Sequence, residues 1–200
     1  EIDRTAEYSW ATFEALKSME LTALSYPAEY GGSGASLVYQ AIAAEELARG
    51  CAATSLQFLI SKLGMLPVIN FGSEFLKRTY LPRICSGASQ CSYGLSEPDA
   101  GSDVASMTTR AVADGDSWII DGTKCWITNA GISDLYTIFA RTSNDRHTGI
   151  TAFSDRNPVQ EYLIGIVNFA EPQCQGCTRV RRRDECLIKP ECGVFFLFAK

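Results

Sequence analysis

The sequence has a single histidine, no long apolar run and no excess of positive charge, and each absence excludes a class of protein. The histidine, His147, lies in a polar loop where a solvated side chain is expected. The 18 Lys and Arg residues are outnumbered by 23 Asp and Glu residues, whereas nucleic-acid phosphates demand a basic face. The longest apolar run, GVFFLFAK at the C-terminal end, is far shorter than the roughly 20 residues that span a bilayer. We therefore expect no nucleic-acid partner and no membrane span.

Cysteine is present, but its pattern is not that of a disulfide-rich protein. Four of the eight cysteines are scattered among apolar neighbours, where buried free thiols are common. The other four lie near the C-terminal end, at positions 174, 177, 186 and 192. A CxxC pair without a second tight pair does not favour zinc, so we predict no metal site.

The first half of the sequence has the periodicity of helices. Apolar residues recur at helical spacing over residues 37–48, with Ser36 as a cap and Gly50 just past the end. Further helices are predicted over residues 8–24, 56–63 and 73–84, the second of these capped by Thr54 or Ser55. This pattern predicts an all-helical N-terminal domain over residues 1–89.

The pattern changes near Gln90 to that of short strands separated by turns. Asp-Gly pairs at 114–115 and 121–122 are turn signals. We predict strands in the runs MTTRAVA, SWII, TKCWIT, LYTIFART and GITAF. Strands joined by tight turns predict a small antiparallel barrel or sandwich over residues 90–153. The predicted fold class is α+β, with helices first and an antiparallel β domain after them.

The stretch YGLSEPDAGSD at residues 93–103 follows an apolar strand with proline, glycine and serine. In an extended strand Gly94 and Ser96 share a face, and Pro98 then breaks the strand into a turn that ends at Gly101 and Ser102. Glycine lets backbone N–H groups converge, and a serine hydroxyl beside them completes a concavity that can hold phosphate. An ordinary strand followed by a surface turn is the alternative.

Charged side chains in the β half constrain this interpretation. Glu97, Asp99 and Asp103 would repel a phosphate that they faced, so a phosphate site requires them to point away or to bond back to the loop. Arg110 and Arg141 lie on predicted strands, and we expect them to be ion-paired or solvated rather than bound to a ligand.

A second stretch, KCWITNAG at residues 124–131, carries an aromatic residue and a hydroxyl. Alternation along a strand places Trp126 and Thr128 on one face and Ile127 on the other. A wide aromatic plane beside a hydroxyl suits a flat heteroaromatic ligand. The alternative is a core tryptophan in a β-sheet, and spacing alone does not separate the two.

Several motifs in order resemble one family. YGLSEPDAGSD, DGTKCWITNAG and YTIFART are similar to the middle domain of acyl-CoA dehydrogenases, FAD enzymes that introduce a double bond between Cα and Cβ of acyl-CoA thioesters. Upstream, YPAEYGGSG, AEELARG and FGSEFLKRTYLPRICSG are similar to the family's helical N-terminal domain. The resemblance covers residues 1–153 and implies an incomplete acyl-CoA dehydrogenase fold. Residues 154–200 do not resemble the family, and we interpret them as a divergent tail from splicing, a frameshift or an assembly error.

The resemblance implies how FAD is held. Residues 93–102 would wrap the pyrimidine edge of the flavin and the phosphates, and Ser96 stands where the family often has threonine. Trp126 would cover a flavin face, and Thr128 would form a hydrogen bond near N5. Ser102 would lie near both phosphate and acyl-CoA. The implied cofactor-binding residues are Tyr93, Gly94, Leu95, Ser96, Gly101, Ser102, Trp126, Ile127 and Thr128.

The mechanism implied by the resemblance is abstraction of the α-proton by a carboxylate while a hydride moves to flavin N5. In the family that carboxylate belongs to a C-terminal helical domain, so we assign no catalytic residue in this sequence and expect the chain alone to be inactive. Implied partners are acyl-CoA, an electron-transfer flavoprotein and further copies in a homo-oligomer, in the mitochondrial matrix or the bacterial cytoplasm. Two alternatives stay open: an acyl-CoA oxidase or flavin monooxygenase of the same fold, and a non-catalytic binding or unstable product.

Overall fold

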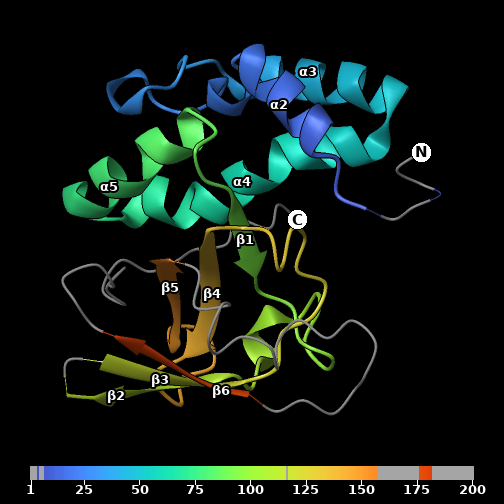
Figure 1. The fold of residues 1–200 in the computed structure, drawn as a ribbon. Coiled ribbons are helices and arrows are strands. Elements are labelled where there is room, and N and C mark those ends of the chain that lie inside the picture. Colours follow the sequence, from blue (N-terminus) through green and yellow to red (C-terminus); the bar gives the residue numbers. More distant parts are fainter. Residues whose placement is uncertain (1–3, 5–6, 116, 157–175, 182–200) are drawn as a thin grey trace.

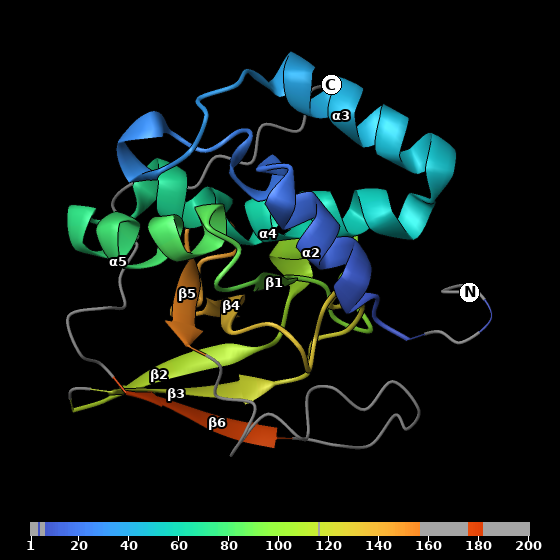
Figure 2. The same ribbon diagram turned by 45° about the horizontal axis from the view of Figure 1, so that its top comes forward.

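A computed structural model describes residues 4, 7–115, 117–156 and 176–181. Figures 1 and 2 show a layer of helices lying over a curled β-sheet, with strand β1 leading from one layer into the other. The helices are α2 (Trp10–Ser18), α3 (Leu37–Gly50), α4 (Ala52–Phe71) and α5 (Glu74–Cys85), with the 3-10 turns η1 (Leu21–Ala23) and η2 (Ala28–Tyr30) between α2 and α3. The predicted helical N-terminal part is therefore confirmed.

The helix boundaries agree with the sequence pattern unevenly. α3 begins after its predicted cap, Ser36, and α5 begins within one residue of the predicted start at position 73, with Ser73 as its cap. α4 is longer than expected because it begins after Cys51 and continues through Pro67. Ser55 is inside this helix rather than at its cap, and its hydroxyl donates a hydrogen bond of 2.8 Å to the carbonyl of Ala44 in α3. The hydroxyl therefore joins two helices instead of ending one.

The length and composition of α4 would also allow a membrane crossing, which the search for apolar runs in the sequence overlooked. The helix has 20 residues, and an 18-residue window within it has a mean hydropathy of 1.4. The central helix of a globular domain has the same properties, and α4 here contacts α2, α3, α5 and β1. We interpret α4 as the core helix of the upper layer.

The N-cap of α5 gives a test of local stability. The Ser73 hydroxyl accepts a hydrogen bond of 3.3 Å from the Leu76 N–H, whereas Ser36 caps α3 without such a bond. Replacing Ser73 with Ala should lower the free energy of unfolding by about 1 kcal/mol. Replacing Ser36 with Ala is the matched control and should change it by less than about 0.5 kcal/mol. Urea denaturation of both variants measures this difference, and equal effects would show that the hydroxyl of Ser73 does not cap.

The predicted fold class, helices first and a β domain after them, is confirmed, but the sheet is mixed and not wholly antiparallel. Its strands are β1 (Cys91–Gly94), β2 (Arg110–Asp114), β3 (Ser117–Gly122), β4 (Leu135–Arg141), β5 (Ile150–Arg156) and β6 (Gly176–Arg181). Their order is β1-β4-β2-β3-β6, and β5 pairs with β4. Both β1 and β2 run parallel to β4, whereas β2–β3, β3–β6 and β4–β5 are antiparallel. Parallel pairs need long connections, and the sequence patterns of hairpins do not reveal them.

The predicted strand TKCWIT does not form. β3 ends at Gly122, and residues 123–134 contain irregular chain and turns. Trp126 and Asn129 have φ angles of 58° and 63°, in the left-handed region that breaks an extended strand. Of the expected divergent tail, residues 154–156 complete β5 and residues 176–181 form β6, and the remainder lies outside the described residues.

One core cluster joins the two layers. Cys91 of β1 and Leu135 of β4 pack with helical residues such as Met65, Val68 and Leu81. All five side chains are at most 3% exposed. Because β1 and the helices share this core, the helical layer fixes the position at which β1 ends and the site begins.

Candidate functional site

The chain leaves the sheet after β1 and returns to the same edge of β4. Gly94 at the end of β1 lies opposite Ile138, and Arg110 at the start of β2 lies opposite Arg141. Residues 95–109 between them form a long excursion that contains most of the YGLSEPDAGSD stretch and the short turn η3 (Val104–Ser106). Two backbone hydrogen bonds between Glu97 and Ala100, of 3.0 and 3.2 Å, close a tight turn within it.

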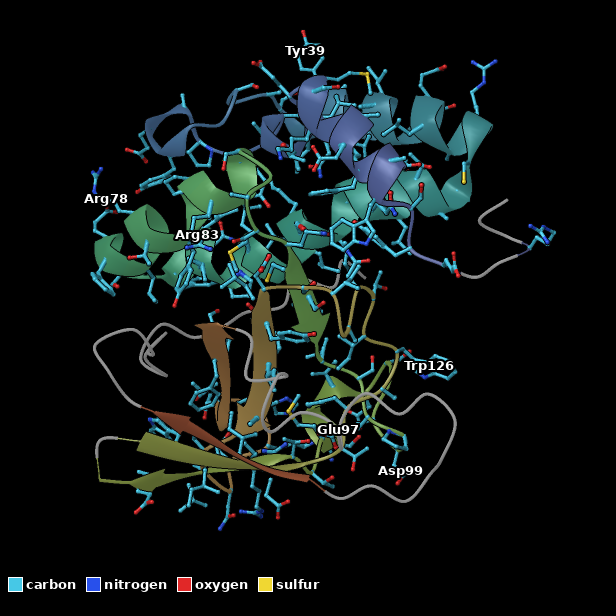
Figure 3. All side chains as sticks on the ribbon, viewed as in Figure 1. Tyr39, Arg78, Arg83, Glu97, Asp99 and Trp126 are labelled. Atoms are coloured by element: carbon cyan, nitrogen blue, oxygen red, sulfur yellow. The ribbon has the colours of Figure 1, made fainter. Side chains whose placement is uncertain are left out.

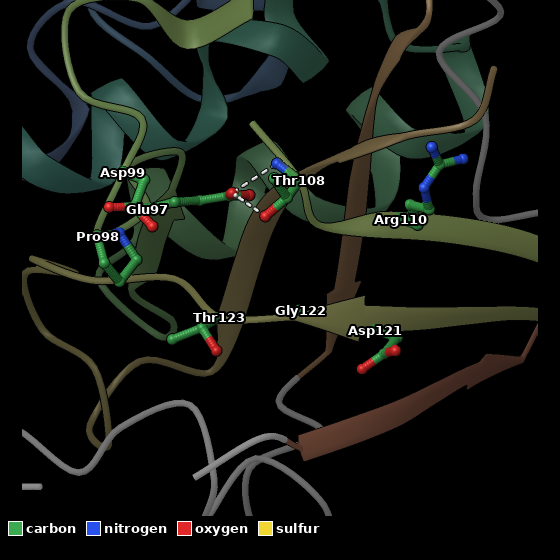
Figure 4. A pocket seen from close by; sticks show the side chains of 8 residues that line it. All are labelled: Glu97, Pro98, Asp99, Thr108, Arg110, Asp121, Gly122 and Thr123. Atoms are coloured by element: carbon green, nitrogen blue, oxygen red, sulfur yellow. Dashed lines mark hydrogen bonds between the residues drawn. The ribbon is translucent and has the colours of Figure 1, made fainter. Parts of the chain in front are cut away.

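The Glu97 carboxylate ties the beginning of this excursion to its end. It accepts hydrogen bonds from the Thr108 N–H at 2.6 Å, the Thr108 hydroxyl at 2.9 Å and the Thr109 N–H at 3.0 Å. Figure 4 shows Glu97 directed toward Thr108. A phosphate site requires the carboxylates of this stretch to point away or to bond back to the loop, and Glu97 bonds back to the loop. Asp103 is drawn to Arg146 by an exposed ion pair of 2.7 Å.

Lys124, from the second stretch, completes this arrangement from the other side. Its ammonium group donates to the Glu97 carboxylate and to the Leu95 carbonyl, each at 2.9 Å. Both side chains of the ion pair are buried, with 1% and 3% of their surfaces exposed. Sequence analysis missed Lys124, although a lone charge in the apolar run TKCWIT, after a stretch with three carboxylates, was a usable signal.

Backbone contacts show that the two stretches lie side by side. The Cys125 N–H donates to the Ser96 carbonyl at 2.9 Å, and the Ser92 hydroxyl donates to the Thr128 carbonyl at 2.8 Å. These bonds hold Ser96 and Thr128 through their carbonyl oxygens and do not use their hydroxyl groups. The motifs found separately in the sequence thus lie next to each other in the structure.

Electrostatics keep the ion pair charged. Burial acts to raise the pKa of Glu97, but the hydrogen bonds from Lys124, Thr108 and Thr109 outweigh it and lower the pKa to about 2. Burial lowers the pKa of Lys124, and the hydrogen bond to Glu97 opposes that change. Because four donors surround the carboxylate, Glu97 is a carboxylate at neutral pH and not a proton acceptor.

The depressed pKa predicts a loss of stability in acid. The pKa of Glu97 falls from an ordinary value of 4.5 to about 2 on folding, so the unfolded chain binds this proton more tightly. The corresponding stabilisation, about 3 kcal/mol, is present above pH 4.5 and is lost as the pH falls from 4.5 toward 2. Urea denaturation at several pH values measures it. Glu97→Gln should flatten this part of the profile, and an unchanged profile in the variant would contradict the assignment.

Trp126 presents its indole ring to solvent. The residue is 81% exposed, and Figure 3 shows it projecting from the edge of the lower layer. Its φ of 58° is an uncommon conformation for a bulky residue and costs about 1–2 kcal/mol. Ile127 is buried against Tyr136 and Ile138. The predicted division of faces between Trp126 and Ile127 therefore holds, although a turn and not a strand produces it.

The other predicted cofactor residues differ in accessibility. Tyr93 packs edge-on against Phe139, with 5.1 Å between ring centroids, and burial raises the pKa of Tyr93 to about 12. Gly94 is buried, and Leu95 packs against the same cluster as Tyr93. Gly101 and Ser102 are exposed on the excursion. A ligand could reach Tyr93, Gly94 and Ile127 only where these partly or fully buried residues are accessible, whereas Gly101 and Ser102 are exposed to solvent.

A cavity of about 370 Å³ lies beside the Glu97 turn and has a different chemistry (Figure 4). Its lining residues are Glu97, Pro98, Asp99, Thr108, Arg110, Asp121, Gly122 and Thr123. Three carboxylates against one guanidinium do not favour phosphate, and none of the predicted cofactor residues lines this space.

Metal ligation has no support in the part of the chain that the structure describes. No group of three or more His, Cys, Asp or Glu side chains there could hold a metal ion. Cysteines 174, 186 and 192 of the C-terminal group lie outside the described residues.

Comparisons with known proteins agree with these observations. Residues 1–88 match the family described as "Acyl-CoA dehydrogenase, N-terminal domain", and residues 92–158 match "Acyl-CoA dehydrogenase, middle domain". A relative named "Probable acyl-CoA dehydrogenase FadE25", from Mycobacterium tuberculosis, is 45% identical over 166 residues. That alignment covers 82% of this chain and 43% of the relative. The chain thus spans less than half the length of the curated relatives that it matches.

Solved structures share the architecture. Butyryl-CoA dehydrogenase from Megasphaera elsdenii superimposes with a TM-score of 0.76 at 26% identity, covering 92% of this chain and 50% of that one. A glutaryl-CoA dehydrogenase from Mycobacterium smegmatis, solved in complex with FADH2, has a TM-score of 0.68 at 28% identity and covers 86% and 47%. Over residues 1–158, this chain therefore belongs to the acyl-CoA dehydrogenase family, of which it carries the N-terminal and middle domains.

Proposed function

We propose that residues 90–153 bind FAD and that the parent enzyme desaturates an acyl-CoA thioester between Cα and Cβ. The observation that carries this proposal is the hydrogen bond from the Cys125 N–H to the Ser96 carbonyl, which aligns the two stretches side by side. It is supported by the M. smegmatis glutaryl-CoA dehydrogenase, a structural neighbour that was solved with FADH2.

The residues present fit the flavin end of the cofactor. Trp126 offers an exposed aromatic plane held in a strained backbone, and such strain is typical of functional positions. The Ser96 and Thr128 hydroxyls would bond to the polar edge of the ring. These three groups come from both stretches, and the buried Lys124–Glu97 pair fixes their spacing before any ligand binds.

The residues present also fit the phosphate end. A Cβ atom added at Gly101 would meet no atom within 4 Å, so the space next to Gly101 is open. Ser102 is exposed beside it, Glu97 is turned inward, and Asp103 is paired with Arg146. Two of the three carboxylates of the stretch thus have partners within the protein. We propose that Gly101 and Ser102 contact the pyrophosphate and that Ser102 also lies near acyl-CoA.

Bound FAD would supply the hydride acceptor of the reaction, and the described residues would bind and orient it. Two of the three carboxylates in the first stretch are unsuitable as the base. Glu97, with its pKa near 2, is committed to Lys124, and Asp103 is committed to Arg146. We assign no base in this chain, and we expect the chain alone to bind flavin without turning over acyl-CoA. Transfer of electrons to an electron-transfer flavoprotein, assembly into a homo-oligomer and residence in the mitochondrial matrix or bacterial cytoplasm belong to the same proposal for the parent enzyme.

The test is to measure flavin binding by the purified 200-residue chain. We expect a visible flavin band that survives gel filtration and does not bleach when acyl-CoAs are added anaerobically. Replacing Trp126 with Ala should weaken FAD binding about tenfold through lost stacking. Because Trp126 is 81% exposed, the free energy of unfolding of the Trp126→Ala variant should differ little from that of the wild type.

A matched control separates stacking from loss of an exposed tryptophan in general. Trp10 is 53% exposed in the helical layer, and Trp10→Ala should leave FAD affinity unchanged. A wild-type chain that binds no flavin, or equal affinities in wild type and Trp126→Ala, would refute the proposed site. Bleaching by acyl-CoA would refute the statement that the chain lacks a base.

A further inference from the structure

Arg141 is a buried cation whose hydrogen-bond partners are carbonyl groups. It is the last residue of β4 and is 8% exposed. Its Nε donates to the Met107 carbonyl at 3.2 Å, its Nη1 to the Asp145 carbonyl at 2.6 Å and its Nη2 to the Ala105 carbonyl at 2.6 Å. The expectation that Arg141 is ion-paired or solvated is wrong, because its guanidinium instead holds backbone.

Two of these carbonyls belong to the end of the excursion. Ala105 lies within η3 and Met107 directly follows it, a few residues after Gly101 and Ser102. The backbone N–H of Arg141 also donates to the Thr109 carbonyl at 2.8 Å, where the chain rejoins the sheet. We call residues 95–97 the outgoing limb of the excursion and residues 105–109 its returning limb. Arg141 thus holds the returning limb through three of its carbonyl groups.

Three charged groups thus hold the excursion. Lys124 holds the outgoing limb at Leu95 and Glu97, and Glu97 ties that limb to Thr108 and Thr109 at the end of the excursion. Arg141 holds the returning limb nearer to the turn, at the carbonyls of Ala105 and Met107. The exposed turn with Gly101 and Ser102 lies between the two limbs. Without the Arg141 side chain, Glu97 would still hold Thr108 and Thr109, but the carbonyls of Ala105 and Met107, which lie closer to the turn, would lose their donor. The direction of the turn therefore depends on Arg141 as well as on Glu97 and Lys124.

We propose that Arg141 is a positioning residue that aims the Gly101–Ser102 turn at the FAD pyrophosphate. The inference rests on the proposed FAD site. Arg141 acts without touching the cofactor, since its Nε and both terminal nitrogens donate to protein carbonyls. A guanidinium is required because its rigid plane presents donors in several directions, whereas a lysine ammonium is a compact group that cannot span three separated carbonyls.

The test compares Arg141→Gln and Arg141→Lys with Arg110→Gln. Arg110 is a matched control because it lies opposite Arg141 in the sheet but is exposed and bonds only weakly, at 3.3 and 3.4 Å, to Asn144. Hydrogen exchange of residues 98–107 in the ligand-free 200-residue chain reports the bracing directly. Affinities for FAD and for riboflavin then separate the phosphate end from the flavin ring, because riboflavin carries no phosphate.

We expect faster exchange of residues 98–107 in both Arg141 variants, FAD affinity lower by about tenfold or more, and unchanged riboflavin affinity. Arg110→Gln should resemble the wild type in all three measurements. If Arg141→Gln does not fold, Arg141→Lys, which retains charge and length, carries the comparison. Unchanged exchange, or an equal loss of FAD and riboflavin affinity, would overturn the inference. Faster exchange in a chain whose wild type binds neither flavin would overturn the proposed function and leave the bracing role established.

Discussion

Replacing Lys124 with Met should lower the free energy of unfolding by about 3–5 kcal/mol. The substitution leaves the Glu97 carboxylate, whose side chain is 3% exposed, without its cation and leaves the Leu95 carbonyl without its donor. The three hydrogen bonds from Thr108 and Thr109 remain, but neutral donors replace the hydration of a buried carboxylate only in part when no counter-charge is present. Urea denaturation at neutral pH measures the loss.

A double-mutant cycle assigns this effect to the ion pair. Glu97→Gln with Lys124→Met should be less destabilising than the sum of the two single changes, because neither uncompensated charge remains. An exposed ion pair provides the control. Lys17 and Glu14 are 39% and 62% exposed, and Lys17→Met should cost less than about 1 kcal/mol. Additive effects of the buried pair, or a loss as small as that of Lys17→Met, would contradict the role given to Lys124.

The same variant links stability to the site. Lys124 bonds to both ends of the segment that contains Leu95, Ser96 and Glu97. Lys124→Met should therefore weaken FAD binding at denaturant concentrations where the chain is still folded. Because Trp126 lies two residues away on the same turn, its fluorescence in the free protein reports whether the turn has moved.

Local signals in the sequence predicted local structure well. The helical period located α3 and α5, Ser36 marked the start of α3, and the Asp-Gly pair at 114–115 located the β2–β3 hairpin. The same signals failed for TKCWIT because alternation of side chains requires an extended backbone. Left-handed residues at Trp126 and Asn129 turn the chain there instead. The parallel pairing of β1 with β4 was equally hidden, because alternation assigns faces and says nothing of partners.

The candidate site likewise contains residues that the sequence predicted and residues that it did not. Ser96, Trp126 and Thr128 were predicted from the two stretches, and the structure places those stretches in contact. Lys124 and Arg141 were not predicted, because their roles depend on atoms 27 to 36 residues distant in sequence. A single charged residue in an apolar strand cannot reveal whether its partner is water, a carboxylate or a carbonyl.

Gly64 illustrates a contact that only the three-dimensional structure reveals, and replacing it should have the second large effect. The glycine lies inside α4, where this helix crosses β1. A Cβ atom added there would come within 2.5 Å of the Cys91 sulfur, 3.1 Å of the Cys91 Cβ and 3.2 Å of the Ser92 carbonyl oxygen. Helix and strand therefore approach more closely than any side chain at position 64 allows.

Two opposing effects decide the outcome of Gly64→Ala. Alanine favours a helix interior by about 1 kcal/mol over glycine, whereas overpacking a core costs about 1–3 kcal/mol. At 2.5 Å from a buried sulfur the steric effect should prevail, so we expect net destabilisation, and Gly64→Leu should exceed about 3 kcal/mol. Gly50→Ala, at the end of α3 with no atom within 4 Å of the added Cβ, is the control and should be neutral or stabilising.

Cys91 supplies the decisive comparison. Cys91→Ala removes the sulfur that the new methyl group would meet, so Gly64→Ala should cost less in that background than in the wild type. Urea denaturation of the four proteins measures this coupling. If Gly64→Ala stabilised the protein, the helix and strand would have to be able to separate, and β1 could not hold the excursion that begins at Leu95. If Gly64→Ala lowers the free energy of unfolding as expected, it should also weaken FAD binding, because the position of β1 sets the position of Ser96.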